Sequence, residues 1–170
     1  MKKLILAALL GLMLCTAGAF AEHPGGWGIG VLGRWGWGWT GDGAGGAALS
    51  LKAPSAPVFW GFSLGFRDHY FGLTATGDYY FIDQTLIPEA NFGWYLGLGG
   101  FASLHIWENF SALTAGVRFP VGISWHPIDP VELFLDVAPG LGIGAYFGDK
   151  SGLYFPAGEF PLELGLRFWF

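Results

Sequence analysis

The last ten residues of the chain, 161–170, alternate between two kinds of side chain. One row is wholly apolar and consists of Leu162, Leu164, Leu166, Phe168 and Phe170. The other row includes Glu163, Gly165 and Arg167. A period of two is typical of a β-strand with one face in an apolar environment. In a transmembrane barrel the apolar row faces lipid and the polar row faces the lumen, so this segment predicts the closing strand of such a barrel.

The other end of the chain predicts export. Two lysines precede an apolar run over residues 4–14, and Ala19-Phe20-Ala21 has the small-x-small pattern of a cleavage site. The run is too short to span a bilayer. We therefore interpret residues 1–21 as a secretory signal peptide and residues 22–170 as one mature domain.

Cys15 is the only cysteine of the chain. A lipoprotein anchor on Cys15 is the alternative to the signal peptide, but it requires small residues just before the cysteine, and Met13 and Leu14 are bulky. Because residues 22–170 contain no cysteine, a disulfide, a cysteine–zinc site or a thiol nucleophile is excluded from the mature domain.

The composition is that of a membrane protein without membrane helices. Hydrophobic residues make up 52% of the chain and charged residues 12%, yet no apolar run of 18 residues follows the signal. A closed β-barrel is the other structure that satisfies the backbone in lipid.

Without the two signal lysines, six basic residues face thirteen acidic ones, a net charge of 6 − 13 = −7. This balance argues against nucleic-acid and anionic-lipid binding.

The alternation recurs in eight segments. The expected strands cover residues 26–39, 44–52, 58–67, 70–81, 90–106, 111–126, 131–147 and a closing strand that ends at 170. Residues 82–89 and 148–156 are expected to be loops. The predicted fold is an all-β, eight-stranded antiparallel up-and-down transmembrane barrel. A soluble lipocalin-type barrel is the alternative, but its apolar face would point inward and its outer face would carry many charges.

The eight-strand count places outward aromatic residues in two bands, as expected at the two membrane interfaces. The band near the periplasmic side, where both ends of the mature chain are expected, comprises Trp27, Trp60, Tyr79, Phe81, Phe92, Trp94, Trp125, Phe168 and Phe170. The outer band comprises Trp37, Trp39, Phe66 and Phe71.

Several stretches together resemble a known family. They are Leu73-Thr74-Ala75-Thr76-Gly77-Asp78-Tyr79-Tyr80, Gly93-Trp94-Tyr95-Leu96-Gly97-Leu98-Gly99-Gly100, Val117-Arg118-Phe119-Pro120-Val121-Gly122-Ile123-Ser124, residues 130–142, and Arg167-Phe168-Trp169-Phe170. The chain resembles small outer-membrane barrels best known from spirochaetes, which are similar in design to the transmembrane domain of OmpA-like proteins. The resemblance covers roughly residues 73–170 and is most specific over 130–142. It implies an outer-membrane location and brings no established activity.

The terminal strand also resembles the C-terminal signal by which such barrels are recognised for insertion. The partners this implies are outer-membrane lipid and the barrel-assembly machinery, which would bind the C-terminal strand. We expect a monomer that binds no nucleic acid.

Eight charged side chains are expected to point into the lumen. The basic ones are Arg34, Arg67, Arg118 and Arg167, and the acidic ones are Asp78, Glu132, Asp136 and Glu163. They form either a polar conduit or a plug of salt bridges. We favour the plug, because an eight-stranded barrel is only wide enough for side chains and buried charges must be paired. Arg118 with Asp136, and Glu163 with Arg34, are the expected neighbours.

The candidates for catalysis are weak. His23 lies in the N-terminal tail, His69 in a turn, His105 near a strand end, and His126 before a proline. Ser124 and His126 share an inward face, but a two-residue spacing separates their Cβ atoms by about 7 Å, which is loose for a nucleophile–base pair. We expect no enzyme activity, no metal site and no cofactor.

The expected function is that of a non-catalytic integral outer-membrane barrel with a structural or surface-interaction role. A narrow channel for ions or small molecules is the alternative, and a lipid-modifying enzyme is a third, less favoured one. Short outer connections argue against an adhesin, and the charged lumen argues against a conduit for apolar solutes.

Overall fold

The computed structural model describes residues 23–38, 46–67, 69–148 and 151–170. The predicted signal peptide and Trp39 lie outside these described residues. Within them, no helix is long and apolar enough to cross a membrane.

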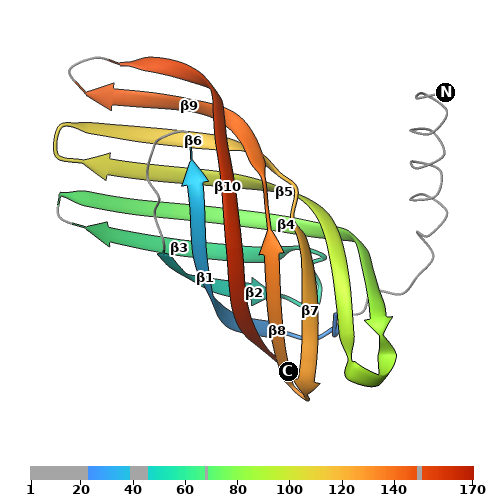
Figure 1. Cartoon of the computed structure of the whole chain (residues 1–170). Helices are drawn as coiled ribbons and strands as arrows, with labels where there is room; N and C mark the ends of the chain where they lie inside the picture. Colours follow the sequence, from blue (N-terminus) through green and yellow to red (C-terminus); the bar gives the residue numbers. More distant parts are fainter. Residues whose placement is uncertain (1–22, 39–45, 68, 149–150) are drawn as a thin grey trace, which may run out of the picture.

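The described residues form one closed antiparallel sheet (Figure 1). Its strand segments are β1 (Gly28–Gly38), β2 (Gly46–Lys52), β3 (Phe59–Arg67), β4 (Tyr70–Ile87), β5 (Phe92–Trp107), β6 (Phe110–Arg118), β7 (Val121–Ile128), β8 (Val131–Val137), β9 (Gly140–Gly148) and β10 (Gly152–Trp169), with a 3-10 turn η1 (Pro88–Ala90). Pairing of β1 with β10 closes the ring.

Two of the barrel strands are each built from two segments. β6 and β7 follow one another along β5 and are interrupted at Pro120. β8 and β9 follow one another along β10 and are interrupted at Pro139. Proline has no N–H to give to the ladder, but the carbonyl of Pro120 still accepts from Gly97 at 2.8 Å and that of Pro139 from Phe119 at 2.9 Å. The ten segments therefore make eight barrel strands, which confirms the predicted fold class.

The ring closes with a large stagger. A path that starts at Phe168 on β10 and steps from each residue to its ladder partner on the next strand returns to β10 at Gly158. Its intermediate residues are Ile29, Leu51, Trp60, Gly77, Gly100, Val117 and Leu141. The path ends 168 − 158 = 10 residues before its start. Such a shear obliges the strands to tilt against the barrel axis, typically by about 35–45°. The stagger decides which inward residues of distant strands lie at the same depth.

β4 continues beyond the expected end at Phe81, so the predicted loop over residues 82–89 is wrong. A register irregularity between Tyr80 and Ile82 lets the strand continue to Ile87. The alternation is lost at this β-bulge, and Ile82 and Asp83 are both buried. The hairpin turns through η1 and projects at the end of the barrel where the C-terminus lies (Figure 1).

β10 begins earlier than expected, so the predicted loop over residues 148–156 is wrong in its second half. The strand starts at Gly152 and shifts register between Tyr154 and Ala157. Because the shift interrupts the period of two, the alternation alone indicates a loop there.

The two faces of the barrel are chemically inverted relative to a soluble protein. Along β10, Leu164 and Phe168 are exposed, while Glu163 and Arg167 are buried. The apolar core inside is small and consists of Leu32, Ala48, Tyr95 and Phe134, with Tyr80 packed against it. An apolar outer face over a polar interior is the arrangement of a transmembrane barrel and the opposite of a lipocalin.

Candidate functional site: the charged lumen

Buried charged side chains gather in two groups along the inner face of β10. A central group surrounds Glu163, and a second group surrounds Arg167 near the C-terminus. The second group lies at the mouth where Trp27 and Phe170 exchange two backbone hydrogen bonds of 3.0 and 2.8 Å. We call this end of the barrel the terminal mouth.

Arg118 lies at the middle of the central group and is 0% exposed. Its Nη2 donates a 2.9 Å hydrogen bond to Oε2 of Glu163, and its Nε lies 3.2 Å from Oδ1 of Asp78. The second contact is an ion pair without an aligned hydrogen bond. Arg118 is paired in the ladders with Gly99 on β5 and Gly140 on β9. Because these neighbours have no side chains, the guanidinium has room to reach both β4 and β10.

Arg34 extends the central group towards the other mouth. Its Nη2 donates a 2.8 Å hydrogen bond to Oε2 of Glu159, and its Nε lies 3.3 Å from Oε1 of Glu163. Arg34 and Glu163 are directly opposite one another in the ladder that closes the ring. Glu163 therefore has two cationic partners, which is what a buried carboxylate needs to offset its desolvation.

Asp136 lies beside the central group but forms no ion pair with Arg118, contrary to the expected contact. Its Oδ2 accepts a 2.7 Å hydrogen bond from the hydroxyl of Tyr95 instead. The register gives the reason: Asp136 is opposite Gly122, whereas Arg118 is opposite Gly140. The two residues share the inner face but differ in depth.

Glu132 and Arg167 form the base of the group at the terminal mouth. They are opposite one another in the ladder, and Nη1 of Arg167 donates to Oε1 and Oε2 of Glu132 at 3.0 and 2.7 Å. Nε and Nη2 of Arg167 donate to the hydroxyl of Ser50 at 3.2 and 3.1 Å. The guanidinium carbon lies 4.8 Å from the ring centroid of Phe59 and 4.4 Å from that of Phe134. Arg167 is thus held by charge, hydrogen bonds and cation–π contacts together.

His23 completes this group, although the sequence places it in a tail. Its Nδ1 lies 2.6 Å from Oδ2 of Asp83, and its Nε2 lies 3.0 Å from Oε1 of Glu132. Its backbone N–H also donates to Oδ2 of Asp83 at 3.2 Å. The imidazole is only 3% exposed. The sequence does not point to Asp83, because the alternation stops after Tyr80 and predicts a loop there instead of an inward side chain. It does not point to His23, because this residue precedes the first alternating segment.

His23 precedes the first strand and is held in an acidic environment. Burial lowers the pKa of its imidazole, but the hydrogen bonds and charges of Asp83 and Glu132 outweigh burial and raise this pKa above its ordinary value of 6.5. The protonated ring is therefore the form that this mouth stabilises.

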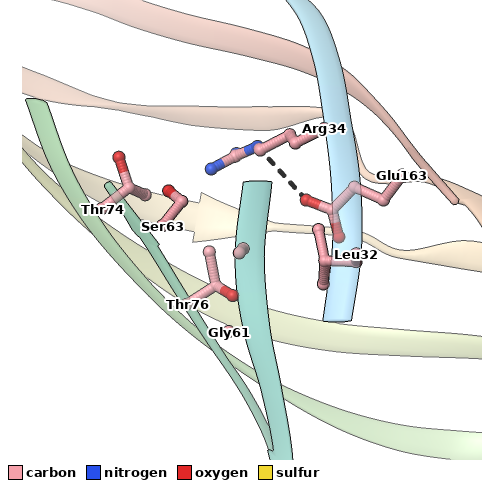
Figure 2. Close-up of a pocket in the computed structure, with 8 residues that line it drawn as sticks. Leu32, Arg34, Gly61, Ser63, Thr74, Thr76 and Glu163 are labelled. Atoms are coloured by element: carbon pink, nitrogen blue, oxygen red, sulfur yellow. Dashed lines mark ion pairs between the residues drawn. The ribbon is translucent and has the colours of Figure 1, made fainter. Parts of the chain in front are cut away.

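A small cavity lies beside the central group (Figure 2). Its volume is about 10 Å³, roughly the space of a single water molecule. Its lining residues are Leu32, Arg34, Ala48, Gly61, Ser63, Thr74, Thr76 and Glu163. The Arg34–Glu163 ion pair borders the cavity on one side, and hydroxyl-bearing side chains of β3 and β4 border it on the other (Figure 2).

The remaining polar candidates are scattered. Nδ1 of His69 lies 2.6 Å from a Glu108 carboxylate oxygen at the surface, and the hydroxyl of Tyr70 is hydrogen-bonded to Nδ1 of His105 at 2.7 Å. Ser124 is buried. The ring of His126 lies 6.2 Å from that of His23. Over the described ranges, no group of three or more His, Cys, Asp or Glu is arranged to bind a metal ion. The side chains of Arg67 and Trp37 lie outside what the structure describes.

The aromatic residues expected at the periplasmic interface are found on the outer surface. Trp27, Trp60, Tyr79, Phe81, Trp125, Phe168 and Phe170 are exposed. Phe92 and Trp94 are half-buried. On the side of the other mouth, Phe66 is exposed and Phe71 is half-buried. The indole N–H of Trp125 donates to the carbonyl of Ala90 at 3.0 Å, which ties the β4–β5 hairpin to β7.

Comparison with known proteins gives one structural likeness. No family model matches the chain, and no curated protein matches it. The crystal structure of Neisserial surface protein A is similar, with a TM-score of 0.46 and 14% sequence identity, covering 86% of this chain and 98% of that one.

Proposed function

We propose that this chain is a non-catalytic integral β-barrel of the bacterial outer membrane with a structural or surface-interaction role. The observation that carries the proposal is the inversion of its faces, with apolar side chains outside and buried ion pairs inside. Outward apolar residues on every side of a closed ring suit lipid. A cleaved signal over residues 1–21 and membership of the small-barrel family from spirochaetes are parts of the same proposal.

The lumen is proposed to be closed to solutes. Arg118 on β6 contacts Asp78 on β4 and Glu163 on β10, so its side chain bridges strands from both sides of its own. Glu132 and Arg167 form a second buried layer nearer the terminal mouth. Two layers of paired charges across an eight-stranded barrel leave little interior volume for a hydrated ion.

The absence of enzyme activity is proposed from the placement of the polar groups. Most ionisable side chains of both groups are buried inside the ring, and Arg34 and Glu159 are half-buried there, whereas a lipid substrate would meet the outer face. Nucleophile, base and orienting group must lie within hydrogen-bond reach of one another and of the substrate. Ser124 and His126 share the inward face but are not hydrogen-bonded to each other.

The partners we propose are outer-membrane lipid and the barrel-assembly machinery. The apolar outer face suits the lipid, and the C-terminal strand β10 is the segment that the machinery would recognise. A closed ring has no unpaired strand edge through which copies could associate, and this supports a monomer.

Conductance across planar bilayers tests the proposal. The barrel, refolded from residues 22–170 and checked for heat-modifiable migration on gels, should give no steady single-channel openings. A matched variant that opens both layers, with Arg118→Ser and Glu163→Ser in the central group and Glu132→Ser and Arg167→Ser in the second, shows what an unblocked lumen conducts. Steady, large conductance from the unaltered barrel would establish the narrow-channel alternative instead.

A further inference from the structure

The ring of His23 is enclosed by aromatic side chains at the terminal mouth. Its centroid lies 5.0 Å from that of Phe59, 5.6 Å from those of Tyr80 and Tyr95, and 6.0 Å from that of Trp169. The carboxylates of Asp83 and Glu132 meet its two ring nitrogens. We call these six residues, Phe59, Tyr80, Asp83, Tyr95, Glu132 and Trp169, the cation cage.

The hydrogen bonds around Glu132 identify the charge of the ring that fills the cage. Both of its carboxylate oxygens accept a hydrogen bond from Nη1 of Arg167, and one of them also accepts the indole N–H of Trp169 at 2.7 Å. The other oxygen contacts Nε2 of His23. Arg167 and Trp169 can only donate, so Glu132 is the acceptor throughout and is ionised. Nε2 of His23 must therefore carry a proton.

The second nitrogen of the ring faces a carboxylate as well. Oδ2 of Asp83 already accepts the backbone N–H of His23 at 3.2 Å and lies 2.6 Å from Nδ1. An oxygen that accepts one N–H is best matched by another donor, which makes Nδ1 protonated too. With both nitrogens protonated, the cage holds an imidazolium cation.

The aromatic walls of the cage and Glu132 have contacts within the barrel itself, whereas the hydrogen bonds of Asp83 are made with His23. The cage residues come from β3, β4, β5, β8 and β10. Tyr80 stacks between Phe59 and Tyr95, with centroid distances of 4.3 Å to each. Glu132 also accepts hydrogen bonds from Arg167 and Trp169, which are independent of its contact with His23. Such preorganisation lowers the cost of binding, since few side chains must be ordered.

We propose that the cation cage is a binding site for a small planar organic cation of imidazolium type, which the chain occupies with its own His23. Two carboxylates fix the ring edge-on, and the aromatic walls stabilise its charge. Because His23 is tethered five residues before β1, its effective concentration at the cage far exceeds that of a free ligand. Residues 23–27 thus keep the terminal mouth closed to competing cations.

The charged and titratable side chains that face the cage from the surrounding strands determine which ligand charge the cage binds best. They are Lys52 on β2, Asp83 with the hydroxyl of Tyr80 on β4, the hydroxyl of Tyr95 on β5, His126 on β7, Glu132 on β8 and Arg167 on β10. Arg167 already neutralises one of the two carboxylates. Lys52 donates to the carbonyl of Ala53 and forms no ion pair with either carboxylate. Asp83 is therefore left to the ring that fills the cage, and a monocation is favoured over a dication or a neutral ring.

Chemical rescue of a His23→Gly barrel tests the proposal. Imidazole is added near pH 6, where it is protonated, and the thermal unfolding midpoint is measured in detergent. We expect the variant to unfold earlier than the wild type and imidazole to restore most of the loss, while the wild-type midpoint stays unchanged. Pyrazole, a ring of the same size that remains neutral at this pH, should restore little. A His23→Gly barrel that also carries Asp83→Asn should lose the rescue.

Equal rescue by imidazole and pyrazole would overturn the proposal, since the site would then merely fill a hole. No shift with either probe would also overturn it. If the glycine variant does not fold, nitrogen NMR of histidine-labelled wild-type barrel gives the answer independently. Two protonated ring nitrogens on His23 at neutral pH support the cage, and a neutral ring refutes it. Neither readout depends on whether the lumen conducts.

Discussion

Replacing Arg118 by alanine should be among the most destabilising single changes in the barrel. The side chain is fully buried and pairs with Glu163 at 2.9 Å and Asp78 at 3.2 Å. Without it, Asp78 loses its ion pair while remaining buried, and Glu163 keeps only Arg34. Removing one member of a buried ion pair typically costs about 3–5 kcal/mol, because the remaining charge is desolvated and uncompensated. At about 1.4 kcal/mol per factor of ten, this lowers the folded-to-unfolded ratio by roughly two to four orders of magnitude.

Reversible urea unfolding in detergent or short-chain lipid, followed by tryptophan fluorescence, measures this loss. The urea midpoint of Arg118→Ala should fall at constant slope, which indicates lost stability rather than a changed unfolded state. Heat-modifiable migration on gels verifies that the variant still forms a barrel before unfolding.

A double variant separates loss of charge compensation from loss of packing. Arg118→Ala combined with Asp78→Asn removes the orphaned carboxylate and should recover part of the free energy, with a coupling of about 0.5–3 kcal/mol for residues in contact. If the single variant lies within about 1 kcal/mol of the wild type, water compensates the carboxylates. The reasoning that the lumen is a dry plug of paired charges would then be refuted.

Three further predictions concern other parts of the barrel. Deleting Phe170 removes the backbone pair with Trp27 and an aromatic residue that is 75% exposed, so it should reduce the heat-modifiable barrel recovered from outer membranes; unchanged yield at modest expression would contradict this. Gly165→Val places a side chain where a neighbouring aromatic ring lies and should lower the free energy of unfolding by about 1–3 kcal/mol through overpacking. Gly100→Ala is the control and should cost less, because its added carbon would meet only a backbone oxygen at 3.5 Å. Because the pKa of His23 is raised on folding, its contribution is fully present below about pH 6.5 and is lost as the pH rises through the folded value. His23→Gln should therefore cost more stability at about pH 6 than at about pH 9, and an equal cost at both would argue against a protonated ring.

Much of the barrel follows from the sequence because the period of two is a local property. The alternation in β10 assigns Glu163 and Arg167 to the lumen and Phe168 to the outer surface without knowledge of any neighbouring strand. The strand count likewise follows from segments bounded by turn residues. These inferences require only that successive side chains point to opposite faces.

The tertiary structure decides which inward residues meet, because alternation identifies a face but not a depth. The ten-residue stagger of the ring and the ladder register bring Arg118 to Glu163 and Asp78, and leave Asp136 to Tyr95. The bulge after Tyr80 adds one residue to β4 and so turns Asp83 inward. The entry of His23 into the terminal mouth depends on partners 60 and 109 residues away in sequence. Contacts at such separations are created by the closure of the ring, and no local pattern encodes them.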